Sequence, residues 1–96
     1  MKPKKPICEI RPDGTKEWRL NGERHREDGP AIEDANGDKE WYLNGELHRE
    51  DGPAIEDIDG YKVWCLNGKY YSEPDFYRQL HKLGKITKEE LFIHLL

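Results

Sequence analysis

Two short strings in the chain place an aspartate three residues after a histidine. They run from His25 to Asp28 and from His48 to Asp51, with Arg-Glu between the two in both cases. A histidine oriented by a nearby carboxylate can act as a general base, as in hydrolases. Neither string has a serine or cysteine nucleophile at a matching position, so we expect the histidines to satisfy local backbone groups. The sequence therefore predicts a chain that is not an enzyme and has no catalytic residues.

Carboxylate and amide oxygens in two other strings resemble fragments of calcium-binding loops. Twelve-residue loops that begin at Asp34 and Asp57 would end on Gly45 and Gly68, where such a loop needs a bidentate glutamate. Turns built on Asx-Gly dipeptides explain both strings without metal. No paired-ligand spacing of cysteines and histidines indicates zinc. We expect no metal and no cofactor.

These strings belong to a repeat of 23 residues, which sets the elements that position them. Residues 14–36 and 37–59 are identical at 18 of 23 positions, and the string at 26–34 recurs unchanged at 49–57. Such identity at a fixed spacing is typical of repeat architectures. The positions that recur through a third unit are Gly14, Gly37 and Gly60, Trp18, Trp41 and Trp64, Leu20, Leu43 and Leu66, and the Asn-Gly pairs at 21, 44 and 67.

Each unit has the pattern of a β-hairpin. Residues 39–43 alternate in polarity, and Asn44-Gly45 is a dipeptide that favours a two-residue hairpin turn. A second turn is expected at 51–53 and a short return strand at 54–56. We expect stacked hairpins to bury one stripe against their neighbours and to leave Arg19, Tyr42 and Cys65 facing outward. The predicted inward stripe is Trp18, Leu20, Trp41, Leu43, Trp64 and Leu66, with Ile32 and Ile55 from the return strands.

The spacing of Gly37, Trp41, Asn44-Gly45 and His48 resembles the MORN repeat, which is also a 23-residue β-hairpin. The likeness is greater to a variant found in small bacterial and phage proteins, and it covers residues 8–71. MORN repeats often have a glycine directly after the histidine, whereas this chain has arginine at 26 and 49. The resemblance implies a scaffold or interaction module without enzymatic activity.

After residue 71 the repeat ends and helix signals begin. Ser72 and Thr87 fit N-cap positions, with Asp75 and Glu90 three residues later. The predicted buried stripe of the first helix is Phe76, Leu80 and Leu83, and Gly84 fits the position after its end. We expect a mainly β fold with an α cap. This fold is one elongated, twisted antiparallel sheet of hairpin repeats over 13–71, preceded by a basic tail and first strand at 1–12 and closed by two short helices at 72–96.

Charge is divided unevenly along the chain. Residues 13–60 hold fifteen acidic and six basic side chains, a balance of -9, within a total of -4. An acidic surface over residues 13–60 argues against direct nucleic-acid binding and favours, as partner, another protein with a basic surface. No apolar run is long enough to span a membrane. The sequence is compatible with a homodimer. The predicted partner-binding residues are Glu27, Asp28, Glu33, Asp34, Tyr42, Glu50, Asp51, Glu56 and Asp57.

The sequence is also compatible with two alternative functions. One is a phage-encoded inhibitor that blocks a host defence or nucleic-acid-processing protein, because an acidic surface can occupy a basic channel. The other is a nucleotide- or lipid-headgroup-binding protein that uses basic residues near the cap, namely Lys62, Lys69, Arg78, Lys82 and Lys85. Cys8 and Cys65 could pair, but we expect free thiols in the cytoplasm, or in the host cytoplasm if the chain is phage-encoded. The sequence leaves the partner, the oligomeric state and the organism open.

Overall fold

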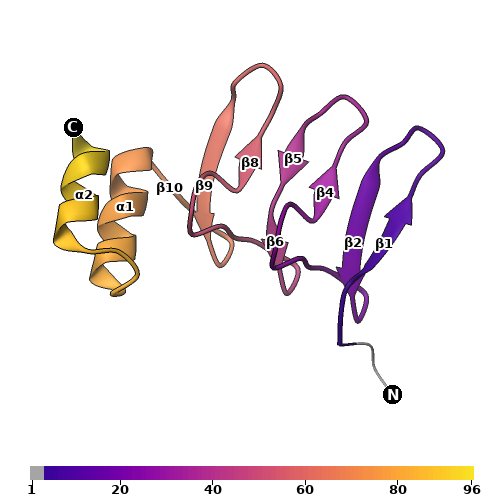
Figure 1. Ribbon diagram of the computed structural model, residues 1–96, viewed down its shortest axis with the longest axis horizontal. Helices are drawn as coiled ribbons and strands as arrows, with labels where there is room; N and C mark the ends of the chain where they lie inside the picture. The colour runs from indigo at the N-terminus through magenta and orange to yellow at the C-terminus, as the bar shows by residue number, and fades with distance from the viewer. Residues whose placement is uncertain (1–3) are drawn as a thin grey trace.

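Three hairpins stand side by side and two helices close one end of the row, as Figure 1 shows. The computed structural model describes residues 4–96, with extents of 43 × 36 × 18 Å. The predicted antiparallel hairpin sheet with a helical cap is confirmed. Its elements are β1 Ile7–Ile10, β2 Lys16–Leu20, β3 Glu23–Arg24, β4 Ile32–Glu33, β5 Lys39–Glu40, β6 Tyr42–Leu43, β7 Glu46–Leu47, β8 Ile55–Glu56, β9 Lys62–Leu66, β10 Lys69–Tyr71, α1 Glu73–Lys82 and α2 Lys88–Leu95. Part of the predicted tail, residues 1–3, lies outside the described residues.

The strands form an open sheet in the order β1-β2-β4-β5-β8-β9-β10, with β3 also paired to β2. The sequence predicts one continuous sheet. The hairpin β6–β7 instead forms a separate two-stranded sheet beside the main one. The three Asn-Gly turns agree with the prediction. Asn44 and Gly45 have φ of 51° and 80°, and the turns at 21 and 67 are nearly the same. Only residues that tolerate positive φ fit this turn, which sets the hairpin register.

In the first two repeats a loop connects β3 to β4 and β7 to β8, at residues 25–30 and 48–53. We call these the HREDGP loops. The Arg49 guanidinium lies 3.8 Å from the centre of the Trp41 ring. It also donates to Asp51 at 2.8 Å and to Glu56 at 2.9 Å. Arg26 covers Trp18 at the same 3.8 Å. A cation stacked on an indole ring stabilises the pair, so each of these tryptophans is covered by its own repeat.

The predicted inward stripe is therefore only partly correct. Trp18, Trp41 and Trp64 are half-buried, whereas Ala31 and Ala54 of the return segments are fully buried. At Trp18 and Trp41 the arginine of the HREDGP loop takes the place that a neighbouring hairpin was expected to take, whereas Trp64 packs against the cluster of Leu66, Phe76 and Leu80. Of the stripe, Ile32 and Leu66 are buried and the remaining members are half-buried.

The opposite face of the sheet is more buried than predicted. Cys65, expected to face outward, is 0% exposed, and Glu17 is 2% exposed. The prediction for Cys65 was wrong because alternation assigns two faces but does not say which one other chain segments cover. Burial raises the pKa of the Cys65 thiol. Cys8 is exposed, and both cysteines are free.

The cap follows the predicted helix signals. The Ser72 hydroxyl accepts from the backbone N–H of Asp75 at 3.3 Å, and Thr87 with Glu90 forms a complete capping box. Phe76 and Leu80 of α1 are buried against Leu66. In the part of the chain that the structure describes, no helix has the length and apolar character needed to cross a membrane.

One helix prediction was wrong. Leu83 is 53% exposed, although it was expected to be buried with Phe76 and Leu80. It is the C-cap of α1, with ψ near 0°, and Gly84 follows with φ of 74°. The buried cluster around Leu66 includes Phe76 and Leu80 but not Leu83, so the packed surface of the helix ends one turn before the helix itself. The positive φ at Gly84 agrees with its predicted place after the helix.

Candidate functional site

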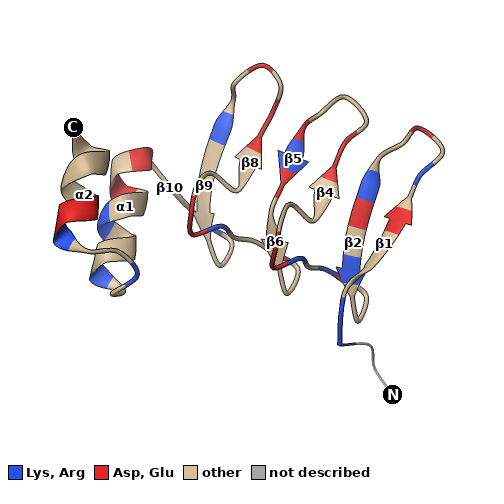
Figure 2. Cartoon of the chain, viewed as in Figure 1, with Lys and Arg blue, Asp and Glu red and all other residues tan. Residues whose placement is uncertain are grey.

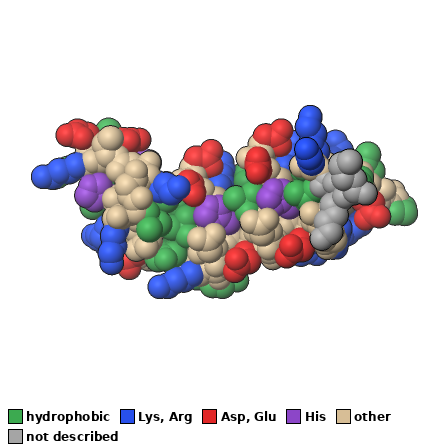
Figure 3. Space-filling model, turned by 90° about the horizontal axis from the view of Figure 1, so that it is seen from below, with side chains coloured by type: hydrophobic (Ala, Val, Ile, Leu, Met, Phe, Trp, Pro, Cys, Tyr) green, Lys and Arg blue, Asp and Glu red, His purple; other side chains and the backbone are tan. Residues whose placement is uncertain are grey.

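A strip of hydrophobic and histidine side chains runs along the underside of the array, with acidic side chains on both sides (Figure 3). Between the two HREDGP loops the strip is hollowed into a groove of about 540 Å³. We call it the middle groove. Trp41, Leu43 and His48 line it together with residues of both loops. The remaining lining residues are Arg26, Glu27, Asp28, Gly29, Pro30, Arg49, Glu50 and Asp51.

The histidines of the HREDGP loops join each repeat to the next one. The Nδ1 atom of His48 accepts a hydrogen bond from the backbone N–H of Asn67 at 2.9 Å, and His25 does the same for Asn44. Because Nδ1 accepts, the neutral ring carries its proton on Nε2 and can donate it to Glu50, 3.1 Å away. Each histidine thus joins one repeat to the next.

The structure brings together only some of the predicted partner-binding carboxylates. Glu27, Asp28, Glu50 and Asp51 all line the middle groove. Their side chains are 83%, 87%, 45% and 86% exposed, so three of the four are largely exposed to solvent. Asp28 and Asp51 also accept from Arg26 and Arg49 of their own loops.

The other predicted carboxylates lie elsewhere. Glu33 and Glu56 are about one-third exposed and accept from Arg26 and Arg49, so they hold the loops in place. Asp57 accepts from two backbone N–H groups of the turn between repeats, at the other end of the hairpins. Asp34 occupies the equivalent turn. Figure 2 shows acidic residues at both ends of the hairpins, so the predicted partner-binding carboxylates do not form one continuous surface.

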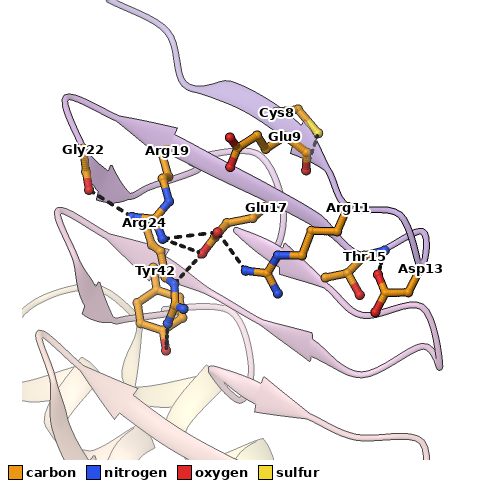
Figure 4. A network of polar contacts seen from close by, with 10 residues as sticks. All are labelled: Cys8, Glu9, Arg11, Asp13, Thr15, Glu17, Arg19, Gly22, Arg24 and Tyr42. Atoms are coloured by element: carbon orange, nitrogen blue, oxygen red, sulfur yellow. Dashed lines mark hydrogen bonds and ion pairs between the residues drawn. The ribbon is translucent and has the colours of Figure 1, made fainter.

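Tyr42, also predicted to bind a partner, belongs to a polar network on the opposite face (Figure 4). Its hydroxyl donates to Glu40 at 2.9 Å and lies 3.4 Å from Arg24. Burial and the hydrogen bond to Glu40 raise the pKa of the Tyr42 hydroxyl. The side chain is half-buried and engaged.

The centre of this network is Glu17, which the sequence reasoning missed. Its carboxylate accepts from Arg24 at 2.6 Å, from Arg11 at 3.0 Å and from Arg19 at 3.2 Å. Burial alone would raise the pKa of Glu17, but the hydrogen bonds from Arg24 and Arg11 and the charge of Arg19 lower it overall. The concentration of arginines at 11, 19 and 24 around one acidic strand position was the available signal.

The same positions become apolar along the array. Glu17 and Arg19 correspond to Glu40 and Tyr42 in the second repeat, and to Val63 and Cys65 in the third. The network is therefore ionic at the first hairpin and absent at the third. A carboxylate held by three arginines is a structural tie, because its lone pairs are already used.

Two further pockets lie at the ends of the strip. The first, which we call the end groove, has a volume of about 430 Å³ and is lined by Trp18, Leu20, Lys4 and Lys5, among others. The second, which we call the cap pocket, has a volume of about 460 Å³. Of the five basic residues predicted near the cap, Lys69, Arg78 and Lys82 line it, whereas Lys62 and Lys85 do not.

Across residues 4–96, no three His, Cys, Asp or Glu side chains are grouped so that they could hold a metal ion. Comparison with protein-family models, with curated proteins and with solved structures finds no match.

Proposed function

We propose that this chain is a non-enzymatic protein-interaction module, and that its middle groove binds a basic surface of another protein. The supporting observation is the arrangement of Glu27, Asp28, Glu50 and Asp51 around an apolar floor. A floor that buries apolar side chains contributes affinity, and a charged rim contributes orientation and association rate. The Nδ1 atoms of the two histidines accept hydrogen bonds between repeats, which supports a structural role for them in this proposal.

The test compares two charge reversals of equal size. The double variant Glu27→Lys with Glu50→Lys alters equivalent positions of the two HREDGP loops. The control, Glu9→Lys with Asp59→Lys, alters exposed carboxylates outside the groove. A partner captured from a lysate by the unaltered chain is purified, and its association rate is measured at several salt concentrations.

We expect the groove variant to slow association about tenfold or more, and the control to leave it nearly unchanged. Affinity for the unaltered chain should fall as salt rises, because the exposed charges are screened. A partner whose binding is indifferent both to the groove variant and to salt would contradict the proposal.

A more specific form of the proposal is inhibition of a nucleic-acid-processing protein, including a phage-encoded inhibitor of host defence. An acidic groove can occupy the basic channel through which such a protein holds nucleic acid. Double-stranded DNA should then compete with the chain for the captured partner. Lack of competition would restrict the proposal to its general form.

A second candidate function is suggested by the cap pocket. Lys69, Arg78 and Lys82 surround about 460 Å³ of space, which suits the phosphates of a nucleotide or a lipid headgroup. Calorimetry with ATP and with inorganic phosphate tests it directly. We expect Lys82→Glu to abolish any heat of binding, whereas Lys62→Glu, outside the pocket, should not.

A further inference from the structure

The cap pocket lies beside the last hairpin, where the repeat is not continued. In the first repeat, the Arg24 guanidinium of β3 lies 5.3 Å from the centre of the Tyr42 ring in the next repeat. Leu47 is the residue equivalent to Arg24 in the second repeat, and it is half-buried. The third residue of this series is Tyr70 of β10, which is followed by helices instead of a further hairpin. Its side chain is 66% exposed and lines the cap pocket.

One stripe of α1 forms the other wall of this pocket. Asp75, Arg78, Gln79 and Lys82 line it, and their spacing of three and four residues places them on one side of the helix. The side of α1 that packs on Leu66 carries none of these four residues. The helix therefore covers the floor of the third hairpin with one side and leaves the pocket between its other side and β10 open.

The pocket is basic although the chain as a whole is acidic. Lys69, Arg78 and Lys82 contribute three positive charges, and Asp75 contributes one negative charge. Figure 2 shows the basic residues on α1. The Asp75 carboxylate accepts from Arg78 at 2.9 Å, whereas neither lysine forms an ion pair with another of residues 4–96. Two ammonium groups can therefore meet an anionic ligand directly.

The pocket also holds side chains that suit an aromatic base. An exposed tyrosine ring, such as that of Tyr70, is a surface on which any nucleobase can stack. The Gln79 side chain is half-buried at the same pocket. Its amide can donate and accept hydrogen bonds, and the edge of a base offers both kinds of group. A ligand with phosphates alone would use neither of these two side chains.

We propose that the cap pocket binds a nucleotide, with its base on the Tyr70 ring and its phosphates between Arg78 and Lys82. The inference rests on the second candidate function, which is the binding of a phosphate-bearing ligand at this pocket. It adds the aromatic base as the second part of the ligand that is recognised. A volume of about 460 Å³ suits a ligand of this size. A lipid headgroup without an aromatic base would leave the Tyr70 ring uncovered.

Charge favours a free nucleotide over a nucleic-acid strand. Residues 61–96 carry four acidic and six basic side chains, whereas residues 13–60 carry fifteen acidic and six basic ones. A strand that extended from the pocket along the hairpins would meet a surface of its own charge, because every nucleotide adds a phosphate. A single nucleotide held beside α1 avoids this repulsion.

The experiment is calorimetry of the full chain with ATP, tripolyphosphate and adenosine. ATP has both parts that the pocket is proposed to recognise, tripolyphosphate has only the phosphates, and adenosine has only the base and sugar. We expect ATP to bind with a dissociation constant on the order of 100 μM. The other two probes should each bind about tenfold more weakly or worse, because each lacks one of the two parts.

Tyr70→Leu tests the stacking surface. Leucine already occupies the equivalent position of the second repeat, so the hairpin should accept it. We expect this variant to weaken ATP binding about tenfold and to leave tripolyphosphate binding unchanged, whereas Tyr70→Trp should retain ATP. The matched control is Tyr61→Leu, because Tyr61 is 62% exposed and lies outside the pocket. Lys82→Gln should weaken both ATP and tripolyphosphate.

The NMR signals of the Tyr70 ring give a second measurement that needs no variant. A base stacked on the ring should move its proton signals upfield when ATP is added to the unaltered chain. Tripolyphosphate should leave these signals almost in place. Should Tyr70→Leu melt early, this comparison tests the stacking by itself, and Tyr70 signals that respond equally to both probes would overturn it.

The outcomes separate this inference from the function on which it rests. Equal affinity for ATP and tripolyphosphate, unaffected by Tyr70→Leu, would overturn base recognition and leave phosphate binding at the pocket intact. No heat with any of the probes at about 1 mM would overturn both. A short oligoadenylate that binds more tightly than ATP would overturn the choice of a free nucleotide. The middle groove shares no lining residue with the cap pocket, so the capture experiment is independent of these results.

Discussion

The Nδ1 atom of His48 accepts a hydrogen bond from the backbone N–H of Asn67, 2.9 Å away in the turn of the following repeat. Asn67 has a φ of 50°, the positive value that this hairpin turn requires. The hydrogen bond to His48 therefore forms when the turn has its hairpin conformation. His25 and Asn44 repeat this contact one unit earlier. Neighbouring repeats are thus joined by a side chain to backbone bond as well as by strand pairing.

Replacement of this histidine should lower the stability of the chain. We expect His48→Ala to reduce the free energy of unfolding by about 1–3 kcal/mol, because the N–H of Asn67 loses its acceptor. Urea denaturation measures the loss, with His81→Ala on the exposed side of α1 as control. A folded His48→Ala protein that fails to bind the partner would show that the histidine acts in the site itself.

The most damaging single truncation should lie in the cap. Phe76 is 0% exposed, and Phe76→Ala should cost about 3–5 kcal/mol because it leaves a cavity against Leu66. Trp41→Ala and Trp18→Ala should cost less and nearly the same as each other, since both rings are half-buried under an arginine at 3.8 Å. Thermal melts of the three variants test this order. A much larger loss for Trp41→Ala would mean that the tryptophans do support one another across repeats.

Glu17 should give the chain a stability that depends on acid pH. Its pKa is lowered in the folded chain, so its contribution is present above the ordinary glutamate value of 4.5 and is lost as pH falls through the lowered value. We expect the unfolding free energy to decline between about pH 5 and pH 2, and Glu17→Gln to reduce this decline. Urea midpoints across this range test the prediction, and Glu89→Gln, which is exposed on α2, is the control. Identical pH profiles for the unaltered chain and Glu17→Gln would contradict it.

The two cysteines should react at very different rates. Cys8 is exposed, whereas Cys65 is 0% exposed and has a raised pKa because of burial. The thiolate is the reactive form, so a disulfide reagent should modify Cys8 quickly and Cys65 only as the chain opens. Mass spectrometry after timed labelling resolves the two, and Cys8→Ser should leave a single slow site. Rapid labelling of that variant would show that the third hairpin opens readily.

The sequence by itself determined the features that depend on residues close together in the chain. The Asn-Gly turns require positive φ at two adjacent positions, and the capping box of Thr87 and Glu90 needs only a spacing of three. The 23-residue period carried these local signals from one unit to the next. Hairpins, their turns and the helical cap could therefore be predicted from it.

The tertiary structure decided which face of each hairpin is covered and by what. Strand alternation separates Trp64 from Cys65, but burial depends on segments that arrive from elsewhere in the chain. Arg49 folds back over Trp41, three arginines enclose Glu17, and α1 covers the third floor in place of a further HREDGP loop. For the same reason Glu27 and Asp51 line one groove, while Asp57 lies in a distant turn. The neighbours of a side chain across a groove depend on how successive repeats pack, and its place within the repeat does not determine them.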